Sequence, residues 1–199
     1  SMGGDGIVAL DEIKTVSDLR GKTVAFNRGG PSDYLLYKAL ADNGVSINEI
    51  KQMEVDDPSK AGDAFLGGSV DAAVTWEPFL SQVVKSGKGH ILLTTKDYPN
   101  IIVDILIAND KITEEKDLII KFLQGWLKSV DYIKDNPKEA AEIMSKEMNL
   151  SIEDVDRMMA GLRYADKEIN KSFFDSMQPT QTKLATIFSD AGNYWKNVN

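Results

Sequence analysis

A chain of 199 residues, of which 42% are apolar, is long enough to bury one substantial core or two small ones. Its net charge of -8 and isoelectric point near 4.7 argue against nucleic acid or an anionic membrane as the main partner. The absence of cysteine excludes disulfides, thiolate catalysis and cysteine-based zinc sites, and no apolar run approaches the roughly 20 residues of a membrane helix.

Short apolar runs alternate with amphipathic stretches in the first half of the chain. The pattern predicts strands at residues 6–9, 23–26, 49–55, 70–75, 91–95 and 101–108. It predicts helices at residues 32–43, 59–66 and 78–85. Alternation at this spacing indicates an α/β fold, with a mostly parallel sheet and helices on both of its faces.

From residue 114 onward the sequence is nearly all helical in pattern. The first long helix carries one apolar stripe, made of Ile119, Phe122, Leu123, Trp126, Val130 and Ile133. Further helices are predicted to begin at Asn136-Pro137 and at Ser151, and the last carries Leu184, Ile187, Phe188 and Ala191. Stripes of this kind are typical of core positions.

The junction after the second strand reads Asn27-Arg28-Gly29-Gly30-Pro31-Ser32 and leads directly into a helix. Glycines let the backbone turn sharply, and proline suits a first helical position. The free amides and the positive dipole end of a helix attract an anion. The junction is therefore either an anion-binding turn or a plain strand-to-helix connection.

A second junction, Trp76-Glu77-Pro78, has the same design. Ligands of parallel sheets bind beyond the carboxyl ends of the strands, where such junctions collect. Trp76 is either a flat wall of a binding site with an N–H donor, or part of the core. Glu77 is either a ligand-facing charge, or a first-turn acid that the helix dipole favours.

Asp104 interrupts the apolar run at residues 101–107. A carboxylate in a strand that is apolar on both faces needs a partner, because burying it alone would cost several kcal/mol. That partner is either a set of neighbouring backbone amides or a cationic group of a ligand. Both interpretations stay open from the residues alone.

Catalytic patterns are absent from the sequence. His90 is the only histidine and stands at a predicted strand start, where it reads as a solvated residue. No phosphate-binding loop, metal-ligand cluster or serine elbow is present. We therefore expect a binding protein and not an enzyme, with no catalytic residues, no metal and no cofactor.

Three stretches, at residues 5–40, 64–87 and 101–110, carry a resemblance when taken together. They resemble the solute-binding proteins of sulfonate, taurine and nitrate-type ABC importers. The resemblance implies a type II periplasmic-binding fold, in which two lobes close on a small ligand. It also implies a set of ligand-binding residues: Asn27, Arg28, Gly29, Gly30, Ser32, Trp76, Glu77 and Asp104. In such relatives the turn holds an acidic headgroup on backbone amides, and the acid that matches Asp104 meets the amine of taurine-like ligands.

The sequence departs from that family at its beginning, because relatives carry further first-lobe strands and helices. The resemblance implies that lobe 1 is incomplete, formed by residues 1–21 and 101–199, and completed by the C-terminal helices. Lobe 2 is expected at residues 22–100. The apolar stripes of the C-terminal helices would then have no full sheet to cover. We therefore expect either a homodimer through the incomplete lobe or a rearranged lobe 1.

The expected function is the substrate-binding component of an ABC importer for a small organic anion or zwitterion, with a sulfonate or taurine-like compound as first choice. Its partners would be that ligand and the membrane subunits of the transporter. Ser1-Met2 resembles a cloning remnant, so we expect a signal peptide upstream and a place in the periplasm or, as a lipoprotein, at the cell surface. The alternatives are a ligand-sensing domain of a signalling protein or regulator, and a relative that binds or makes pyrimidine precursors.

Overall fold

The computed structural model of this protein describes residues 1–176 and 178–198, and the chain divides into two compact units. The first unit comprises residues 1–103 and 157–162. The second comprises the described residues of 104–156 and 163–199.

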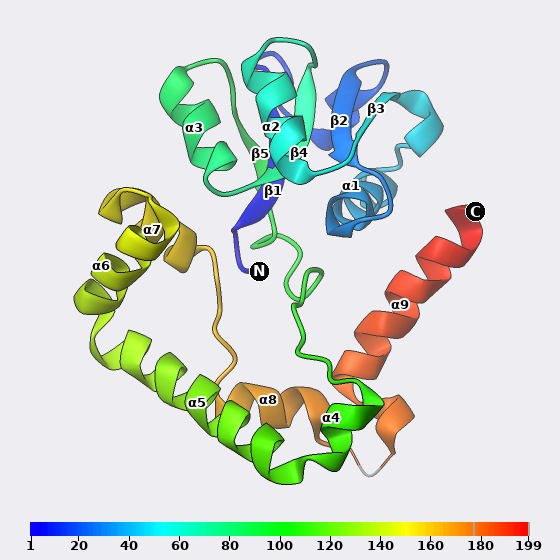
Figure 1. The fold of residues 1–199 in the computed structure, drawn as a ribbon. Helices are drawn as coiled ribbons and strands as arrows, with labels where there is room; N and C mark the ends of the chain where they lie inside the picture. Colours follow the sequence, from blue (N-terminus) through cyan, green and yellow to red (C-terminus); the bar gives the residue numbers. More distant parts are fainter. Residues whose placement is uncertain (177, 199) are drawn as a thin grey trace. The chain divides into compact units, whose positions relative to one another are not determined.

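The first unit is built on one mixed sheet of five strands in the order β3-β2-β4-β1-β5 (Figure 1). The strands are β1 (Asp5–Ala9), β2 (Thr23–Asn27), β3 (Lys51–Val55), β4 (Ala72–Trp76) and β5 (His90–Thr94). β2 runs parallel to β3 and β4, while β1 lies antiparallel between β4 and β5. The predicted parallel sheet is thus confirmed for four strands, and β1 is the inverted exception.

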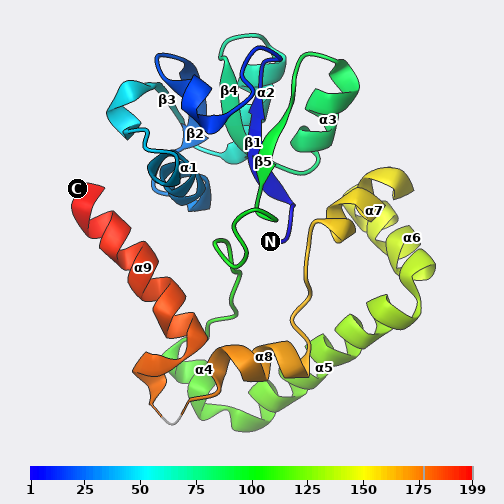
Figure 2. The same cartoon turned by 180° about the vertical axis from the view of Figure 1, so that it is seen from behind.

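Helices cover both faces of this sheet, as the α/β pattern predicts (Figures 1 and 2). One face receives α1 (Pro31–Asp42) and the short η1 turn (Val16–Leu19), while the other receives α2 (Pro58–Leu66) and α3 (Phe79–Ser86). A short η2 turn (Ile47–Glu49) leads into β3. Each predicted helix of the first half is present within two residues of its expected start.

The two cores follow from the alternation of side chains along each strand. Ile7 and Phe26 point into the cluster beneath α1, whereas Val8 and Ala25 point into the cluster beneath α2 and α3. All four side chains are fully buried. A sheet buried on both faces requires nearly continuous apolar strands, and those are the runs that the sequence shows.

The second unit is helical throughout its regular structure. Its elements are α4 (Asp110–Glu114), α5 (Lys116–Asp135), α6 (Pro137–Met148), most of α7 (Ile152–Ala160), α8 (Lys167–Phe174), η3 (Pro179–Gln181) and α9 (Lys183–Val198). α5 contacts α4 and α6, and α8 contacts α9. Lys134 bridges α5 to Asp166 at 2.6 Å, and this ion pair holds the pKa of the Asp166 carboxyl below its ordinary value.

The apolar stripes of the second unit are only partly buried. Val130 is 2% exposed, but Phe122 and Trp126 on the same helix are 54% and 46% exposed. Phe188 of α9 is 52% exposed. The helical periodicity therefore predicts the helices correctly, whereas the expectation that these positions form a core holds for few of them.

The strand predicted at residues 101–108 is wrong. The segment is irregular, and no described strand pairs with it. Asp104 is exposed, and Leu106 and Ile107 are 65% and 80% exposed. High β propensity does not make a strand without a neighbour to accept its backbone hydrogen bonds. Asp104 is thus not an acid enclosed in an apolar strand.

The boundary predicted at residue 22 does not coincide with the boundary between the units. Residues 1–21 lie in the first unit, because β1 pairs with β4 and β5 in the middle of the sheet. The second unit begins after residue 103. How these units correspond to the two lobes of a binding fold stays a prediction.

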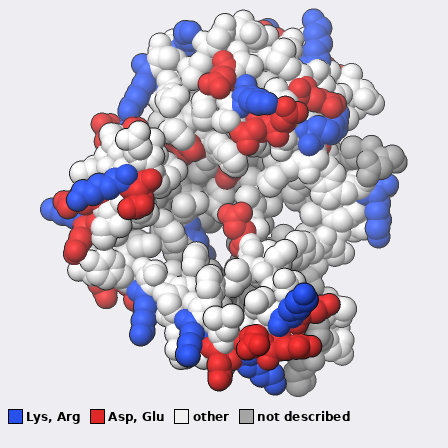
Figure 3. Space-filling view, in the orientation of Figure 1, with Lys and Arg blue, Asp and Glu red and all other residues white. Residues whose placement is uncertain are grey.

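Acidic and basic side chains are interspersed on the face of the molecule shown in Figure 3. This distribution agrees with the absence of a broad basic field in the sequence. No described helix combines the length and the apolar character needed to cross a membrane.

Candidate functional site

The predicted turn and Trp76 lie at the same edge of the sheet in the first unit. β2 and β4 are parallel, so the residues that follow Asn27 and Trp76 leave the sheet on one side. The end of β3 lies there too, because β3 is parallel to β2. Two helices, α1 and α2, begin at this edge immediately after β2 and β3.

The starts of α1 and α2 form a matched pair. Each helix has proline at its first position and serine at its second: Gly30-Pro31-Ser32 in α1 and Asp57-Pro58-Ser59 in α2. In α2 the Asp57 Oδ1 atom accepts the Ser59 N–H at 2.8 Å and also the Ser59 hydroxyl. These hydrogen bonds hold the pKa of the Asp57 carboxyl below its ordinary value. The start of α2 is therefore occupied by its own cap.

The start of α1 has no such cap, because glycine stands where α2 has aspartate. Among residues 1–176 and 178–198, neither the amide nor the hydroxyl of Ser32 has a hydrogen-bond partner, and although the residue as a whole is only 4% exposed, its hydroxyl oxygen reaches solvent. A hydroxyl that reaches solvent and has no partner within the protein is able to donate to a ligand. Ser32 thus offers two donors to a ligand at the positive end of a helix.

Asn27 and Gly30 shape this turn and do not offer free groups to a ligand. The Asn27 Nδ2 atom donates to the carbonyl oxygens of Val55 at 3.1 Å and Asp56 at 2.9 Å. The Gly30 N–H donates to the Asn27 carbonyl oxygen, and a Cβ atom at Gly30 would collide with the Asn27 side chain. Glycine is required here because the Asn27 amide fills that space.

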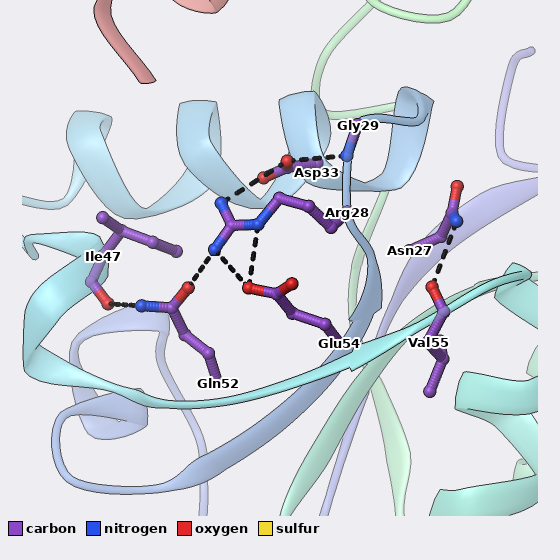
Figure 4. A network of polar contacts seen from close by, with 8 residues as sticks. All are labelled: Asn27, Arg28, Gly29, Asp33, Ile47, Gln52, Glu54 and Val55. Atoms are coloured by element: carbon purple, nitrogen blue, oxygen red, sulfur yellow. Dashed lines mark hydrogen bonds and ion pairs between the residues drawn. The ribbon is translucent and has the colours of Figure 1, made fainter. Parts of the chain in front are cut away.

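Arg28 is engaged by the protein on three sides (Figure 4). Its Nε and Nη2 atoms lie 3.0 and 2.7 Å from Glu54 Oε1, and Nη2 also donates to Gln52. Its Nη1 atom lies 3.7 Å from the Oδ2 atom of Asp33, which also accepts the Gly29 N–H at 3.0 Å. The guanidinium carbon lies 5.1 Å from the ring centre of Phe26. Arg28 and the Gly29 amide are therefore committed to internal contacts.

Trp76 is the last residue of β4, and Glu77 follows it at the same edge. Trp76 is 40% exposed, which places it outside the core and leaves its ring available as a wall. Glu77 accepts hydrogen bonds from the amide of Ser81 at 3.1 Å and from its hydroxyl at 2.8 Å. Glu77 precedes the N-cap residue Pro78, so it is not in the first turn of α3 as predicted, but its carboxylate caps the Ser81 amide of that turn. The structure thus gives Glu77 a structural role, and a ligand contact of Glu77 stays a prediction.

Two further predicted features lie elsewhere. Asp104 belongs to the second unit, and its meeting with a ligand amine stays a prediction. His90 is the first residue of β5 and pairs with Ala9, at the opposite end of the sheet from the turn. Its Nδ1 atom lies 3.7 Å from Asp11 Oδ1. Over the described parts of the chain, no cluster of histidine and acidic residues could hold a metal ion.

A hollow of about 400 Å³ opens in the second unit, between α5 and α6. It is lined mainly by apolar side chains, among them Tyr132, Ile133, Ile143 and Met144. It contains none of the predicted site residues. The convergent polar groups of the first unit are a better basis for a ligand site than this apolar hollow.

Sequence reasoning missed Asp33, which is fully buried and joins Gly29 to Arg28. The available signal was its place at the third position of a helix whose cap is glycine, where an acid is favoured by the free amides. A second signal in the sequence is that Ser32 and Ser59 both follow a proline at a helix start, whereas the residue before the proline is glycine in one case and aspartate in the other.

The mixed sheet with helices on both faces matches the fold of periplasmic-binding proteins, as the comparison with known structures shows. The model of the NMT1/THI5-like family matches residues 5–140, and this chain belongs to that family. An Escherichia coli K12 protein, whose name assigns it provisionally to the aliphatic sulfonates-binding proteins, is 30% identical over 139 residues. That match covers 69% of this chain and 43% of the relative. A Bacillus subtilis protein with the same name is 29% identical over 169 residues, which is 84% of this chain and 51% of the relative.

The crystal structure of the periplasmic aliphatic sulphonate-binding protein SsuA from Escherichia coli superimposes with a TM-score of 0.78. The two chains are 21% identical, and the match covers 99% of this chain and 65% of SsuA. This likeness confirms the predicted fold class. The chain spans about half the length of the curated relatives that it matches.

Proposed function

We propose that this chain is the substrate-binding component of an ABC importer for a small organic anion or zwitterion, with a sulfonate or taurine-like compound as the first choice. The observation that carries the proposal is the open start of α1. The Ser32 amide and hydroxyl have no hydrogen-bond partner among the described residues, while the equivalent groups of Ser59 in α2 are taken by Asp57. The names of the relatives support the choice of ligand.

In this proposal the sulfonate oxygens accept hydrogen bonds from the Ser32 amide and hydroxyl. Trp76 supplies a flat apolar wall for the short carbon chain of the ligand. The protein binds and releases the ligand without turnover. It acts outside the cytoplasm, in the periplasm or as a membrane-anchored lipoprotein, and delivers the ligand to the membrane subunits of the transporter.

The test is a calorimetric titration of the protein with ethanesulfonate, compared for two variants. Ser32→Ala is expected to weaken binding by ten- to a hundredfold, because it removes a hydrogen bond to a charged group worth about 1.5–3 kcal/mol. Ser59→Ala is the matched control, since it changes the same helix position where Asp57 already occupies the site, and it should leave binding within twofold. Equal losses in both variants, or no binding of ethanesulfonate, would contradict the proposal.

A variant of Asp104 tests whether the ligand is a zwitterion or a plain anion. If its carboxylate meets the amine of a taurine-like ligand, Asp104→Asn weakens taurine binding by ten- to a hundredfold and leaves ethanesulfonate binding unchanged. An equal effect on both ligands would show that Asp104 does not read the amine. The exposure of Asp104 makes this variant safe for folding.

We also propose that the protein self-associates through the apolar helix faces of the second unit. Phe122 and Trp126 lie one helical turn apart on α5 and are each about half exposed, as is Phe188 of α9. A second copy presents the same surface and so provides a matching partner. A ligand-sensing domain remains the alternative function, and binding of a partner signalling domain instead of transporter subunits would favour it.

A further inference from the structure

Residues 103–108 have the apolar, β-branched composition of a strand, but no described strand pairs with them. They form an irregular stretch of chain (Figure 1), in which Ile105, Leu106 and Ile107 are 43%, 65% and 80% exposed. Among the residues that the structure describes, none forms a hydrogen bond with a backbone amide or carbonyl of this segment. The segment thus combines exposed apolar side chains with an unpaired backbone, and a neighbouring strand would satisfy both.

The sheet of the first unit ends in two different edge strands, β3 and β5. β3 carries Lys51 and Glu54, and charges on an edge strand discourage a further strand from pairing with it. β5 carries no lysine, arginine or acid, its central residues are aliphatic, and all of its residues are half-buried. Its last amide, that of Thr94, donates to Asp97 at 2.9 Å. β5 is therefore the edge that is better suited to receive a strand, over residues 90–93.

The charges around the segment and around β5 are complementary. Asp104 and Asp110 lie on either side of residues 105–108, whereas Lys88 lies just before β5 and Lys96 just after it. All four charged residues are exposed, and within the described parts of the chain none of them forms an ion pair. A strand laid along β5 brings an acid near each basic end, whichever way it runs. Because exposed ion pairs contribute little energy, these charges set the placement of the strand more than its affinity.

We propose that residues 103–108 of one copy of this chain add as a strand to the β5 edge of a second copy, and that the second copy does the same in return. Each copy has one unpaired segment and one open edge, so a two-fold pair satisfies both. The backbone of the segment gains hydrogen-bond partners, and its aliphatic side chains leave water against those of β5. This pairing uses a different surface from the helix faces of the second unit.

Hydrogen exchange followed by mass spectrometry tests the pairing, because it reports on the amides of the segment and of the edge strand separately. The wild-type protein is measured without ligand at low and at high micromolar concentration. We expect exchange at residues 103–108 and at β5 to become at least about tenfold slower at the higher concentration. The other edge strand, β3, is the internal control, and its exchange should not depend on concentration.

Proline variants then remove the backbone donors of the segment. Successive amides of a strand point to opposite sides, so at least one of Leu106→Pro and Ile107→Pro loses an N–H that faces β5. That variant should lose the slowing at residues 103–108 and at β5 together. Both side chains are exposed and their amides have no partner within the described chain, so the fold tolerates proline there. Leu106→Val is the matched control, because it keeps the N–H and the β-strand preference, and it should keep the slowing.

An exchange rate at residues 103–108 that does not change with concentration would overturn the inference, whether the segment is fast or slow at both concentrations. Slowing of the segment without slowing of β5, or slowing that persists in both proline variants, would also overturn it. Circular dichroism checks the fold of the variants, and if neither proline variant folds, the wild-type concentration series decides alone. These measurements contain no ligand, so a failure of sulfonate binding would remove the proposed function and leave this inference standing.

Discussion

Phe26 and Phe65 in the first unit are at most 1% exposed, whereas Phe122 and Phe188 in the second unit are 54% and 52% exposed. Both units contain periodic apolar residues and well-formed helices. They differ in the surface against which their helices can pack. The helices of the first unit pack on a sheet, and no described sheet lies in the second unit. The comparison teaches that an amphipathic stripe specifies a helix, while burial depends on a matching surface.

The largest expected effect is a difference in core stability between the units. Phe65→Ala empties a packed site between α2, α3 and the sheet, and should lower the free energy of unfolding by about 3–5 kcal/mol. Phe122→Ala changes a half-exposed side chain and should lower it by about 1 kcal/mol or less. Urea unfolding followed by circular dichroism measures both. Equal losses would mean that Phe122 is buried in solution.

Two glycines should respond to alanine with opposite signs. Gly30→Ala forces the Asn27 side chain away from Val55 and Asp56, and the loss of two hydrogen bonds should cost about 1–3 kcal/mol. Gly125→Ala in α5 meets open space within a helix and should stabilise the second unit by up to about 1 kcal/mol. Thermal unfolding of the two variants gives the comparison. A destabilising Gly125→Ala would show that α5 packs closely against another surface there.

Self-association probes the open surface of the second unit directly. Light scattering at micromolar concentration should give a mass above that of a monomer, and Phe122→Glu should weaken association at least tenfold, which is about 1.4 kcal/mol. Val84→Glu is the matched control, because Val84 of the first unit is 52% exposed, much like Phe122. A monomeric wild-type protein that also binds a sulfonate tightly would refute association through this surface.

The smallest expected effect is a loss of folding stability as the pH falls. Hydrogen bonds from Thr15 lower the pKa of Asp18, and those from Ser46 and Ser59 lower the pKa values of Glu49 and Asp57, all in the first unit. Because their folded pKa values lie below the unfolded ones, these groups stabilise the fold above about pH 4 and lose that contribution as pH falls further.

Asp18→Asn should flatten part of this dependence when the midpoint of urea unfolding is measured between pH 5 and pH 2.5. Asp18 and Glu49 are exposed and Asp57 is half-buried, so the change should be much smaller than that of Phe65→Ala. Hydrogen exchange resolved by residue should place the loss mainly in the first unit. An Asp18→Asn variant with the full wild-type slope would show that this capping turn does not contribute.

Much of the first unit was predictable because local and long-range signals agree there. The run at residues 23–26 and the helix that begins at Pro31 are both present, and so is the turn between them. The inversion of β1 was not predictable, since strand direction depends on pairing with residues far along the chain. Residues 101–108 show the limit most clearly, because their apolar character predicts a strand and no described partner completes it.

The candidate site was predictable in place more than in detail. The sequence indicates that Ser32 and Trp76 lie at the same edge of the sheet, and the structure puts them there. Arg28 and Asn27 make their hydrogen bonds within the protein because β3 supplies the acceptors, which are the Glu54 carboxylate and the Val55 carbonyl. No local pattern around residue 28 contains that information.

The inverted β1 strand also has a consequence for biosynthesis. It ends at Ala9, but its neighbours β4 and β5 begin only at Ala72 and His90. At a synthesis rate of about 5–20 residues per second, the ribosome needs roughly 3–12 s to deliver β4. During that interval Ile7 and Val8, which end fully buried, have no sheet to enter. β1 is therefore the strand of this sheet that waits longest during synthesis for its first neighbour.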